Sequence, residues 1–535
     1  MGKNIKLEIL KRALVPLAIV LLAVFSPAHA KGNIDELFKG GAGGWLNVER
    51  PLTADEIKGR VVLLDFWTYG CINCMQIVPD LDYLEQKFGD KLLIIGVHSA
   101  KFKGEQGNDR ILAAAQRFGL KHPVINDSDF AIWKSYGVEA WPTQILLDEK
   151  GDEIERYSGE GHRAEIEADI KGALVVDGKE TAKPVPAIAA DAKDKSILWF
   201  PSKIVQGNSG DTTDLFFVTD TGHNRILGFD ATGKIKVTIG SGKKALKDGS
   251  YKDAAFNMPH GIEALGERLI VADTGNHALR EVDLKAGTVT TLAGTGKRGF
   301  GRGIPDVSDS TWDTFNGVAG KTTDLASPWD VKFIEDSRVT RLVVAMAGLH
   351  QLWLYDAQSG EVGVLAGSGA EGIADGAATQ ATLAQPSGLS VDGNNNIVFV
   401  DAESSALRKL DGNNVKTLIG TGLFKFGLKD GKYPDAMLQH PQGLLADHAS
   451  GKIYIADTYN NAIRIYDPQT QELSTLPLDG DTLKEPGDIL LTEGYALVVD
   501  TGNHAIKKID LRAKSDKVED WGKPSGHIET LKLHF

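Results

Sequence analysis

The chain has 535 residues, more than one hydrophobic core usually organises, so two or more domains are expected. Its 59 Lys and Arg residues against 72 Asp and Glu residues give a net charge of −13, without a basic cluster interleaved with aromatics. Because phosphate binding needs clustered positive charge, this composition argues against a nucleic-acid partner. The chain has two cysteines, too few for a scaffold stapled by several disulfides.

The N-terminus has the three parts of a secretory signal peptide. Basic residues at positions 3, 6, 11 and 12 precede an apolar segment at 13–25, and Ser-Pro-Ala-His-Ala follows at 26–30. The apolar segment is shorter than the roughly 20 residues that cross a bilayer, which leaves a retained anchor as the less favoured alternative. We therefore expect removal of residues 1–30, export to the periplasm, and a mature chain from Lys31 without a stable membrane span.

Both cysteines, Cys71 and Cys74, lie where a predicted strand is followed by a predicted helix. The apolar run at 61–66 predicts a buried strand, and residues 71–88 predict an amphipathic helix. Cys71 would then lie at the helix N-terminus, where backbone N–H groups and the helix dipole favour a thiolate. Cys74 follows one helical turn later, so the pair predicts a dithiol that can form a disulfide and open again.

This motif resembles the redox site of thioredoxin-like proteins in three separated features. Asp65 lies six residues before the first cysteine, at the place of that family's buried acid. Pro79 lies five residues after the second cysteine, at the place of its helix-kinking proline. The run Trp-Pro-Thr at 141–143 precedes a predicted strand at 145–147 and matches its cis-proline loop. Gly70 departs from the pattern, because many relatives carry tryptophan there.

The resemblance implies a thiol-disulfide oxidoreductase and assigns roles to its residues. Cys71 is the nucleophile, Cys74 the resolving thiol, Asp65 the proton acceptor for Cys74, and Pro142 the residue that aligns an incoming substrate strand. The implied partners are a protein thiol or disulfide substrate and a redox partner, with neither a cofactor nor a metal ion. Residues beside the motif and the proline loop are the expected substrate contacts: Trp67, Tyr69, Trp141 and Thr143.

Other interpretations of these residues stay open. Thioredoxin folds also occur as inactive adaptors. Asp65 could be a structural carboxylate, and the aromatic residues could fill the core instead of forming an apolar rim around the sulfurs. His98 follows a predicted strand and is a secondary candidate, since a lone histidine there is more often hydrogen-bonded in a structural role.

The first domain is expected at 31–176. Its remaining predicted elements are a strand at 92–97, a helix at 110–118, a hairpin of strands at 145–147 and 153–157, and a helix at 164–174. This order predicts an α/β sandwich around a central mixed sheet. A stretch rich in Gly, Lys, Ala, Asp and Pro at 177–196 then predicts a linker.

A cassette repeats six times beyond this linker, and ten residues separate its opening position from a closing aspartate. The opening residue is Asp at positions 220, 273, 401, 457 and 500, and Met346 in the third unit. Each cassette predicts two short strands joined by a tight turn. A proline opens most units, at 259, 328, 386, 441 and 486, with a weaker first copy at 201.

Six units of four strands predict an all-β six-bladed propeller at 197–512, and the cassettes resemble NHL repeats. One end of the chain must supply the strand that closes the ring, and residues 513–535 are expected as a C-terminal tail. His277, His350 and His504 share one repeat position, which would suit a ring of metal ligands. The other three units hold Asn, Ser and Asn there, which favours a turn position that needs a small polar group.

The whole architecture resembles the family of NHL repeat-containing protein 2 and its bacterial relatives. That group commonly has Cys-Cys-Ile-Asn-Cys, where this chain has Gly70 as the leading residue, and its animal members continue into a C-terminal β-domain. We therefore expect an exported thiol-disulfide oxidoreductase whose propeller docks a protein. The alternatives are a non-enzymatic binding scaffold with a structural or redox-sensing thioredoxin domain, and a metal-dependent propeller enzyme.

Overall fold

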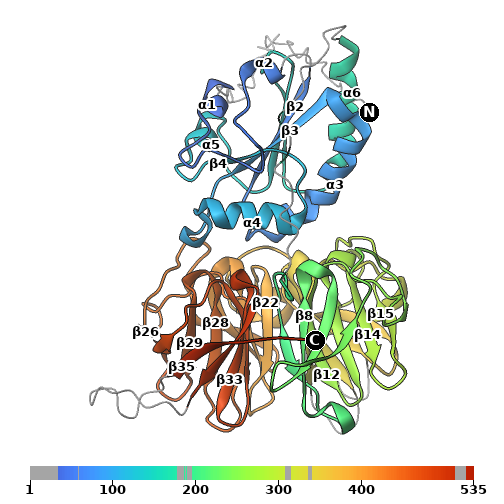
Figure 1. The fold of residues 1–535 in the computed structure, drawn as a ribbon, viewed down its shortest axis with the longest axis vertical. Helices are drawn as coiled ribbons and strands as arrows, with labels where there is room; N and C mark the ends of the chain where they lie inside the picture. Colours follow the sequence, from blue (N-terminus) through green and yellow to red (C-terminus); the bar gives the residue numbers. More distant parts are fainter. Residues whose placement is uncertain are drawn as a thin grey trace, which may run out of the picture.

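The computed structural model describes residues 34–57, 60–176, 186, 188, 196–307, 315–334, 340–511 and 526–535. They form two domains, with α4 and neighbouring loops of the first lying over one face of the second (Figure 1). The expected signal peptide at 1–30 and most of the expected linker lie outside the described residues. Within the described ranges, no helix is both long and apolar enough to cross a bilayer.

The first domain is a six-stranded mixed sheet with helices on both faces, ordered β1-β4-β3-β2-β5-β6. Its strands are β1 (Trp45–Leu46), β2 (Val61–Trp67), β3 (Leu92–His98), β4 (Val124–Asn126), β5 (Thr143–Leu147) and β6 (Glu153–Ser158). Its helices are α1 (Ile34–Lys39), α2 (Ala54–Ile57), α3 (Ile72–Phe88), α4 (Asn108–Phe118), α5 (Ala131–Ser135) and α6 (Arg163–Val176). The predicted α/β domain is confirmed, and the sequence missed only short elements.

The central strand β2 explains why this sequence folds into layers. Every residue of β2 is buried, and its side chains alternate between the two faces of the sheet. Val62 and Leu64 pack in the cluster that includes residues of α1 and α5, whereas Val61 and Leu63 pack with residues of α3 and α6. The largely apolar sequence of β2 is therefore typical of a strand that is buried on both faces of its sheet.

The second domain is a ring of six blades, each built from strands that follow one another in the chain. Blades one and two are β7 (Ile204–Gln206), β8 (Leu215–Asp220), β9 (Arg225–Asp230) and β10 (Ile235–Ile239), then β11 (Gly249–Ser250), β12 (Pro259–Leu265), β13 (Arg268–Asp273), β14 (Ala278–Asp283) and β15 (Thr288–Ala293). Blades three and four are β16 (Val318–Ala319), β17 (Pro328–Ile334), β18 (Arg341–Met346), β19 (Gln351–Asp356) and β20 (Glu361–Ala366), then β21 (Gly376–Ala377), β22 (Pro386–Val391), β23 (Ile397–Asp401), β24 (Ala406–Asp411) and β25 (Asn414–Ile419). Blades five and six are β26 (Gly431–Lys432), β27 (Gly443–Ala446), β28 (Ile453–Asp457), β29 (Ala462–Asp467) and β30 (Glu472–Thr475), then β31 (Leu478–Gly480), β32 (Pro486–Leu491), β33 (Tyr495–Asp500), β34 (Ala505–Asp510) and β35 (Gly526–Leu531). The inner strands β7, β12, β17, β22, β27 and β32 contact one another in a closed circuit, so the predicted six-bladed propeller is confirmed.

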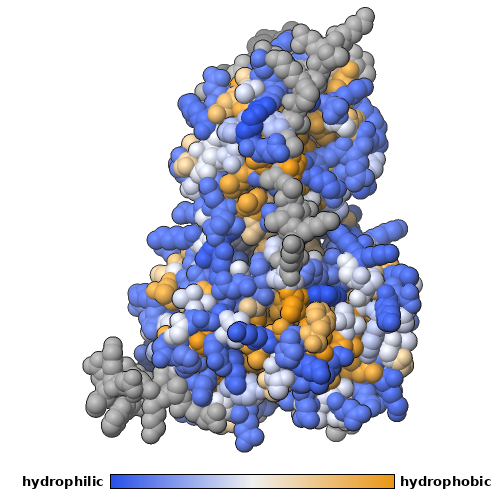
Figure 2. Space-filling model, viewed as in Figure 1, coloured by the Kyte–Doolittle hydropathy of each residue, from blue (hydrophilic) through white to orange (hydrophobic). Residues whose placement is uncertain are grey.

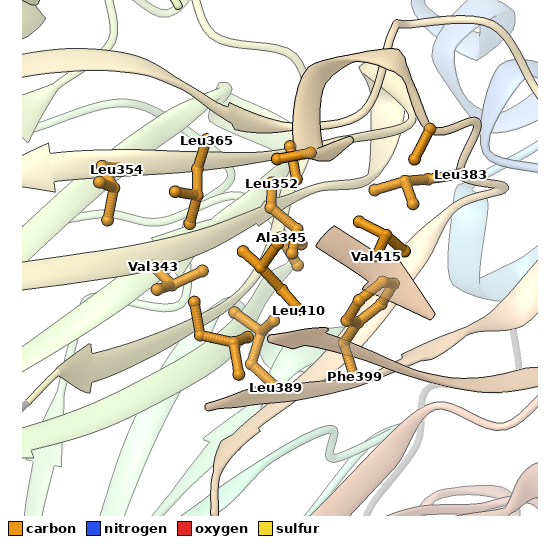
Figure 3. Close-up of a cluster of buried hydrophobic side chains, with 14 of the residues drawn as sticks. Val343, Ala345, Leu352, Leu354, Leu365, Leu383, Leu389, Phe399, Leu410 and Val415 are labelled. Atoms are coloured by element: carbon orange, nitrogen blue, oxygen red, sulfur yellow. The ribbon is translucent and has the colours of Figure 1, made fainter. Parts of the chain in front are cut away.

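Apolar side chains fill the space between neighbouring blades. Hydrophilic residues cover most of the face seen in Figure 2. Between blades three and four, Val343 and Leu352 lie in one buried cluster with Leu389, Phe399 and Leu410 (Figure 3). Because each blade buries its faces against its neighbours, the ring is stable as a whole rather than blade by blade.

The opening aspartate of the cassette binds an arginine seven residues later in three blades. These fully buried pairs are Asp273–Arg280 at 2.8 Å, Asp401–Arg408 at 3.1 Å and Asp457–Arg464 at 2.7 Å. In blade three, Met346 and Trp353 occupy the same two positions within one apolar cluster. An apolar pair of suitable volume can replace a buried ion pair at little cost, which explains the exceptional Met346.

The repeat position of His277 is the turn position that the sequence predicts. All six residues there have a left-handed φ of 50–55°. Each side chain accepts a backbone N–H from the next blade: Asn224 from Met258 (2.8 Å), His277 from Ser327 (3.0 Å), His350 from Gln385 (3.1 Å), Ser405 from His440 (3.1 Å), Asn461 from Glu485 (3.0 Å) and His504 from Phe200 (3.1 Å). The last of these bonds returns from blade six to blade one, so this position ties the ring together.

The segment expected as a C-terminal tail belongs in part to the propeller, which corrects the predicted boundary. Strand β35 pairs antiparallel with β34 and parallel with β31 in blade six. Beyond it, the N–H of His534 donates to the carbonyl of Gly233 at 2.9 Å, and its carbonyl accepts the N–H of Ile235 at 2.7 Å. The C-terminal end therefore closes the ring, and this strand carries no cassette by which the repeat pattern could identify it.

Candidate active site

The two cysteines lie at the corner between β2 and α3, as predicted. Cys71 is the N-cap of α3, and its Sγ accepts the N–H of Cys74 at 3.3 Å. Both are free thiols, with Cys71 9% exposed and Cys74 3% exposed. Cys71 is thus the more exposed of the two sulfurs, and it lies at the N-terminus of α3.

Asp65 is buried in β2 and accepts a hydrogen bond from Gln144 Nε2 at 3.1 Å. Burial raises the pKa of Asp65 to about 6, although the Gln144 bond and the charge of His122 oppose the shift. Burial also raises the pKa of the Cys74 thiol, and Cys71 and the charge of Asp65 raise it further. A thiol that resists ionisation needs a neighbouring base, and a carboxylate with a pKa near 6 suits that task.

The proline loop lies at the wall of the same site. The Trp141–Pro142 peptide bond is cis, and Trp141 lines a cavity together with Cys71. The Trp141 ring packs against Trp133 with 4.5 Å between ring centroids. Thr143 is 1% exposed, and its hydroxyl donates to the carbonyl of Ala140 at 2.8 Å, so its side chain holds the loop rather than facing a substrate.

The other two predicted substrate contacts point elsewhere. Trp67 is 3% exposed and packs on His98 and Phe118 inside the first domain, where it fills the core. The hydroxyl of Tyr69 lies 3.0 Å from Glu485 Oε1 of the propeller and 3.1 Å from the carbonyl of Gly104. Tyr69 therefore belongs to the contact between the domains.

His98 has the structural role that the sequence favours. Its side chain is completely buried, and its Nε2 accepts the N–H of Tyr69 at 3.2 Å. Burial lowers the pKa of His98 to about 3, which keeps the ring neutral.

In every blade, the residue before the blade-opening proline contacts the first domain, alongside further contacts such as that of Tyr459 with Phe102. We call these six residues the docking ring: Phe200, Met258, Ser327, Gln385, His440 and Glu485. All have a positive φ, between 46° and 61°. Their contacts are Phe200 with Arg117, Met258 with the apolar cluster around the cysteines, Ser327 with Gln76, Gln385 with Gly70 and Ile72, His440 with Phe102, and Glu485 with Tyr69.

Within the docking ring, Gln385 holds the backbone on both sides of Cys71. Its Oε1 accepts the N–H of Ile72 at 2.9 Å, and its Nε2 donates to the carbonyl of Gly70 at 3.0 Å. Blade four therefore satisfies backbone groups that flank Cys71. Sequence reasoning missed these six residues, since they differ from one another. One signal could have identified them: the position before each blade-opening proline varies from unit to unit, whereas the neighbouring positions repeat.

Gly70 is explained by this contact. A Cβ atom at position 70 would lie 2.8 Å from Glu105 Oε1, 2.9 Å from the Tyr459 hydroxyl and 3.1 Å from His440 Cε1. Two of these atoms belong to the propeller, so a larger residue there would press against blade five. A side chain at position 70 would therefore require Glu105, Tyr459 or His440 to move.

Glu105 is a second residue that the sequence did not single out. This fully buried carboxylate accepts hydrogen bonds from the N–H of Gly70 (2.8 Å), the Thr68 hydroxyl (2.7 Å) and the N–H of Phe102 (2.9 Å). Burial raises the pKa of Glu105 to about 7 despite these bonds. It positions the loop that leads into Cys71.

A cavity of about 170 Å³ lies between the domains beside Cys71. Lys101 and Trp141 of the first domain line it, together with Glu371, Glu403 and Phe424 of the propeller among others. Lys101 forms an ion pair with Glu403, and their side chains are 6% and 7% exposed. Cys71 therefore meets solvent through a cavity shared by both domains rather than on an open face.

Known proteins are similar to this chain over one domain or over both. A thioredoxin-like family model matches residues 59–153. The chain is 38% identical over 502 residues to Protein SUPPRESSOR OF QUENCHING 1, chloroplastic, of Arabidopsis thaliana, covering 88% of this chain but only 46% of that protein. It is 29% identical over 116 residues to Thiol-disulfide oxidoreductase ResA of Bacillus thuringiensis (strain Al Hakam), covering 22% of this chain and 65% of that protein.

A third relative matches across both domains and along most of its own length. The chain is 37% identical over 521 residues to NHL repeat-containing protein 2 of Homo sapiens, covering 88% of this chain and 69% of that protein. Together with the thioredoxin-like domain and the six blades in the order described, this similarity shows that the chain belongs to the family of NHL repeat-containing protein 2.

Proposed function

We propose that the protein is an exported thiol-disulfide oxidoreductase that uses Cys71 and Cys74 as its dithiol. The observation that carries the proposal is the position of Cys71 Sγ, at the N-terminus of α3, 3.3 Å from the backbone nitrogen of Cys74 and at the wall of a cavity. The similarity to a protein named thiol-disulfide oxidoreductase supports the same chemistry. The signal-peptide pattern at 1–30 supports export to the periplasm.

The reaction proceeds in two displacements. The Cys71 thiolate attacks one sulfur of a substrate disulfide, forms a mixed disulfide and releases the other sulfur as a thiolate. Cys74 then gives its proton to Asp65 and attacks the Cys71 sulfur, which releases the second substrate thiolate. Two electrons pass to the substrate, and the Cys71–Cys74 disulfide forms. The steps also run in reverse, and Ile72 and Asn73 between the cysteines add no charge that would favour either direction.

A protein partner would dock on the propeller away from the docking ring. The face that carries this ring is occupied by the first domain of the same chain (Figure 1). The opposite face and the outer strands of the blades are therefore the surfaces we assign to a separate protein.

The test is to trap the mixed disulfide. In Cys74→Ser the second displacement cannot occur, so a substrate should stay bound to Cys71 and be released by dithiothreitol. The double variant Cys71→Ser, Cys74→Ser is the matched control and should capture nothing. Absence of a dithiothreitol-sensitive adduct in periplasmic extracts of cells that express Cys74→Ser would contradict the proposal.

A second candidate function is a binding scaffold in which the thioredoxin domain is structural or redox-sensing. The observation that favours it is the burial of both sulfurs at the domain contact, with Gln385 bonded on either side of Cys71. A scaffold predicts that Cys71→Ser leaves the cellular phenotype intact, whereas changes on one propeller face abolish it. The reduction potential of the Cys71–Cys74 couple separates the two, because an inert pair would not exchange with a glutathione buffer.

A further inference from the structure

The cavity beside Cys71 is small, and both domains build it. Its volume of about 170 Å³ is well below the roughly 300–1,000 Å³ of sites for drug-sized ligands. Cys71 is only 9% exposed, which favours a small disulfide over a folded protein as the molecule that reaches its sulfur while the domains stay in contact. A compact aliphatic disulfide is the kind of redox substrate that this space admits.

The wall of this cavity carries more negative than positive charge. Three carboxylates line it, from Glu139, Glu371 and Glu403, against the single ammonium of Lys101. Lys101 is bound to Glu403 Oε2, which leaves the charges of Glu139 and Glu371 without an opposite charge in the wall. An anionic disulfide would be repelled there, and a cationic one attracted.

Glu403 also offers a hydrogen-bond acceptor without a donor. Its Oε1 is buried and accepts no hydrogen bond within the described part of the chain, although the side chain is only 7% exposed. Buried carboxylate oxygens are normally hydrogen-bonded, so Glu403, a residue that lines the cavity, has one unsatisfied acceptor oxygen. An ammonium group, which has three N–H donors, would satisfy it.

We propose that this cavity is a binding site for low-molecular-weight disulfides that carry an ammonium group. The proposal rests on the redox function proposed above and names a substrate class for the same site. The ammonium group binds between Glu371 and Glu403, the methylene groups pack against Trp141 and Phe424, and the disulfide meets Cys71 Sγ.

The reaction with such a substrate balances without a further reagent. The Cys71 thiolate attacks one sulfur, the substrate S–S bond breaks, and the first aminothiolate leaves and takes a proton from water. Cys74 loses its proton to Asp65 and attacks the Cys71 sulfur, and the second aminothiolate leaves with that proton. The disulfide gains two electrons and becomes two aminothiols, while the Cys71–Cys74 pair is oxidised.

The charge of Glu371 makes this preference dependent on pH. Desolvation and then repulsion from Glu403 raise the pKa of Glu371 to about 7, with smaller contributions from Asp401 and Glu160 in the same direction and from Lys101 in the opposite one. Glu371 is therefore charged above pH 7 and loses its charge below it. The preference for a cationic disulfide should weaken as the pH falls from 8 to 6.

The experiment compares three small disulfides on the reduced full-length protein. They are cystamine (cationic), 2-hydroxyethyl disulfide (neutral) and 2,2′-dithiodiacetate (anionic), and stopped-flow measurements follow oxidation of the Cys71–Cys74 pair. Each rate is divided by the rate of the same disulfide with dithiothreitol, which removes intrinsic differences in reactivity. Because all three meet the same thiolate, ratios between them are independent of its ionised fraction.

We expect the corrected cystamine rate to exceed the dithiodiacetate rate by about tenfold at pH 8. Glu371→Gln should reduce this ratio at least threefold, whereas Glu472→Gln, an exposed carboxylate on β30, should leave it unchanged. A ratio near one in the unmodified protein, or one that Glu371→Gln does not alter, overturns the inference while the redox function stands. Failure of all three disulfides to oxidise the pair would instead count against the redox function itself.

Discussion

Gln385 of blade four and Ile72 of α3 share a hydrogen bond, in which Gln385 Oε1 accepts the Ile72 N–H at 2.9 Å. That N–H belongs to the first turn of α3, where backbone donors have no partner within the helix. The same side chain donates to the carbonyl of Gly70 at 3.0 Å. Contact between the domains and access to Cys71 are therefore coupled through one propeller residue.

Removing this side chain should loosen the domain contact. Gln385→Ala leaves the N–H of Ile72 and the carbonyl of Gly70 without partners, at a cost of about 1–3 kcal/mol for a buried group. We expect Cys71 to react several-fold faster with iodoacetamide than in the unmodified protein. The matched control is Gln358→Ala, an exposed residue between β19 and β20. Equal alkylation rates in all three proteins would show that Gln385 does not govern access.

Gly70→Ala, a change in the first domain, should destabilise the same contact between the domains. Its Cβ would lie 2.9 Å from the Tyr459 hydroxyl and 2.8 Å from Glu105 Oε1, and such overpacking costs about 1–3 kcal/mol. Tyr459→Phe removes the hydroxyl, so the double variant should recover part of the loss. Urea unfolding of the four proteins gives the coupling energy. Strict additivity of the two changes would contradict the close approach.

The buried pair Asp401–Arg408 should be costly to break but cheap to replace. Arg408→Met leaves the Asp401 carboxylate buried without its partner, and we expect a loss of about 3–5 kcal/mol in the free energy of unfolding. The double variant Asp401→Met, Arg408→Trp copies blade three, where Met346 Sδ accepts the N–H of Ala326 at 3.4 Å.

That double variant should lose much less stability than Arg408→Met alone, as measured by urea unfolding. Arg302→Met, at an exposed position, is the control for the loss of a guanidinium group. A double variant that is less stable than the single one would show that blade three is not a template for blade four.

Asp65 should make stability depend on pH between about 4 and 6. Its pKa is raised to about 6 in the folded protein, so the folded state holds a proton that the unfolded chain has released. Stability contributed by the protonated form is present below pH 4 and is lost as the pH rises through 6. Relative to Asp65→Asn, the protein should lose about 3 kcal/mol over this range, followed by urea unfolding at each pH.

The same variant tests the proposed role of Asp65 as a base. In Asp65→Asn, the mixed disulfide with a small substrate should persist longer at pH 7, since Cys74 loses its nearby proton acceptor. Mass spectrometry of quenched samples measures its lifetime. An unchanged lifetime would leave Asp65 as a structural carboxylate only.

Local pattern was sufficient to predict the secondary structure around the cysteines. The apolar run of β2 and the spacing of Cys71, Cys74 and Asp65 are properties of neighbouring residues, and the structure places all three at one corner of the sheet. Among the predicted substrate contacts, Trp67 and Thr143 are buried inside the first domain. Local sequence could not predict this, because residues distant in the chain determine whether a side chain is buried.

The sequence alone also determined the number of blades and the turn position of His277, because a contact that recurs in every blade leaves the same kind of residue at the same place in each repeat. Only the tertiary structure showed that the docking ring contacts the first domain. Its six residues occupy one repeat position, but each contacts a different part of that domain, which has no matching symmetry. The tertiary structure also decided the closing strand β35, whose pairing joins the end of the chain to the ring. A contact that recurs in every blade requires a similar residue at the same position of every repeat, and the sequence shows that repetition. A contact that forms once between distant segments produces no repeated residue.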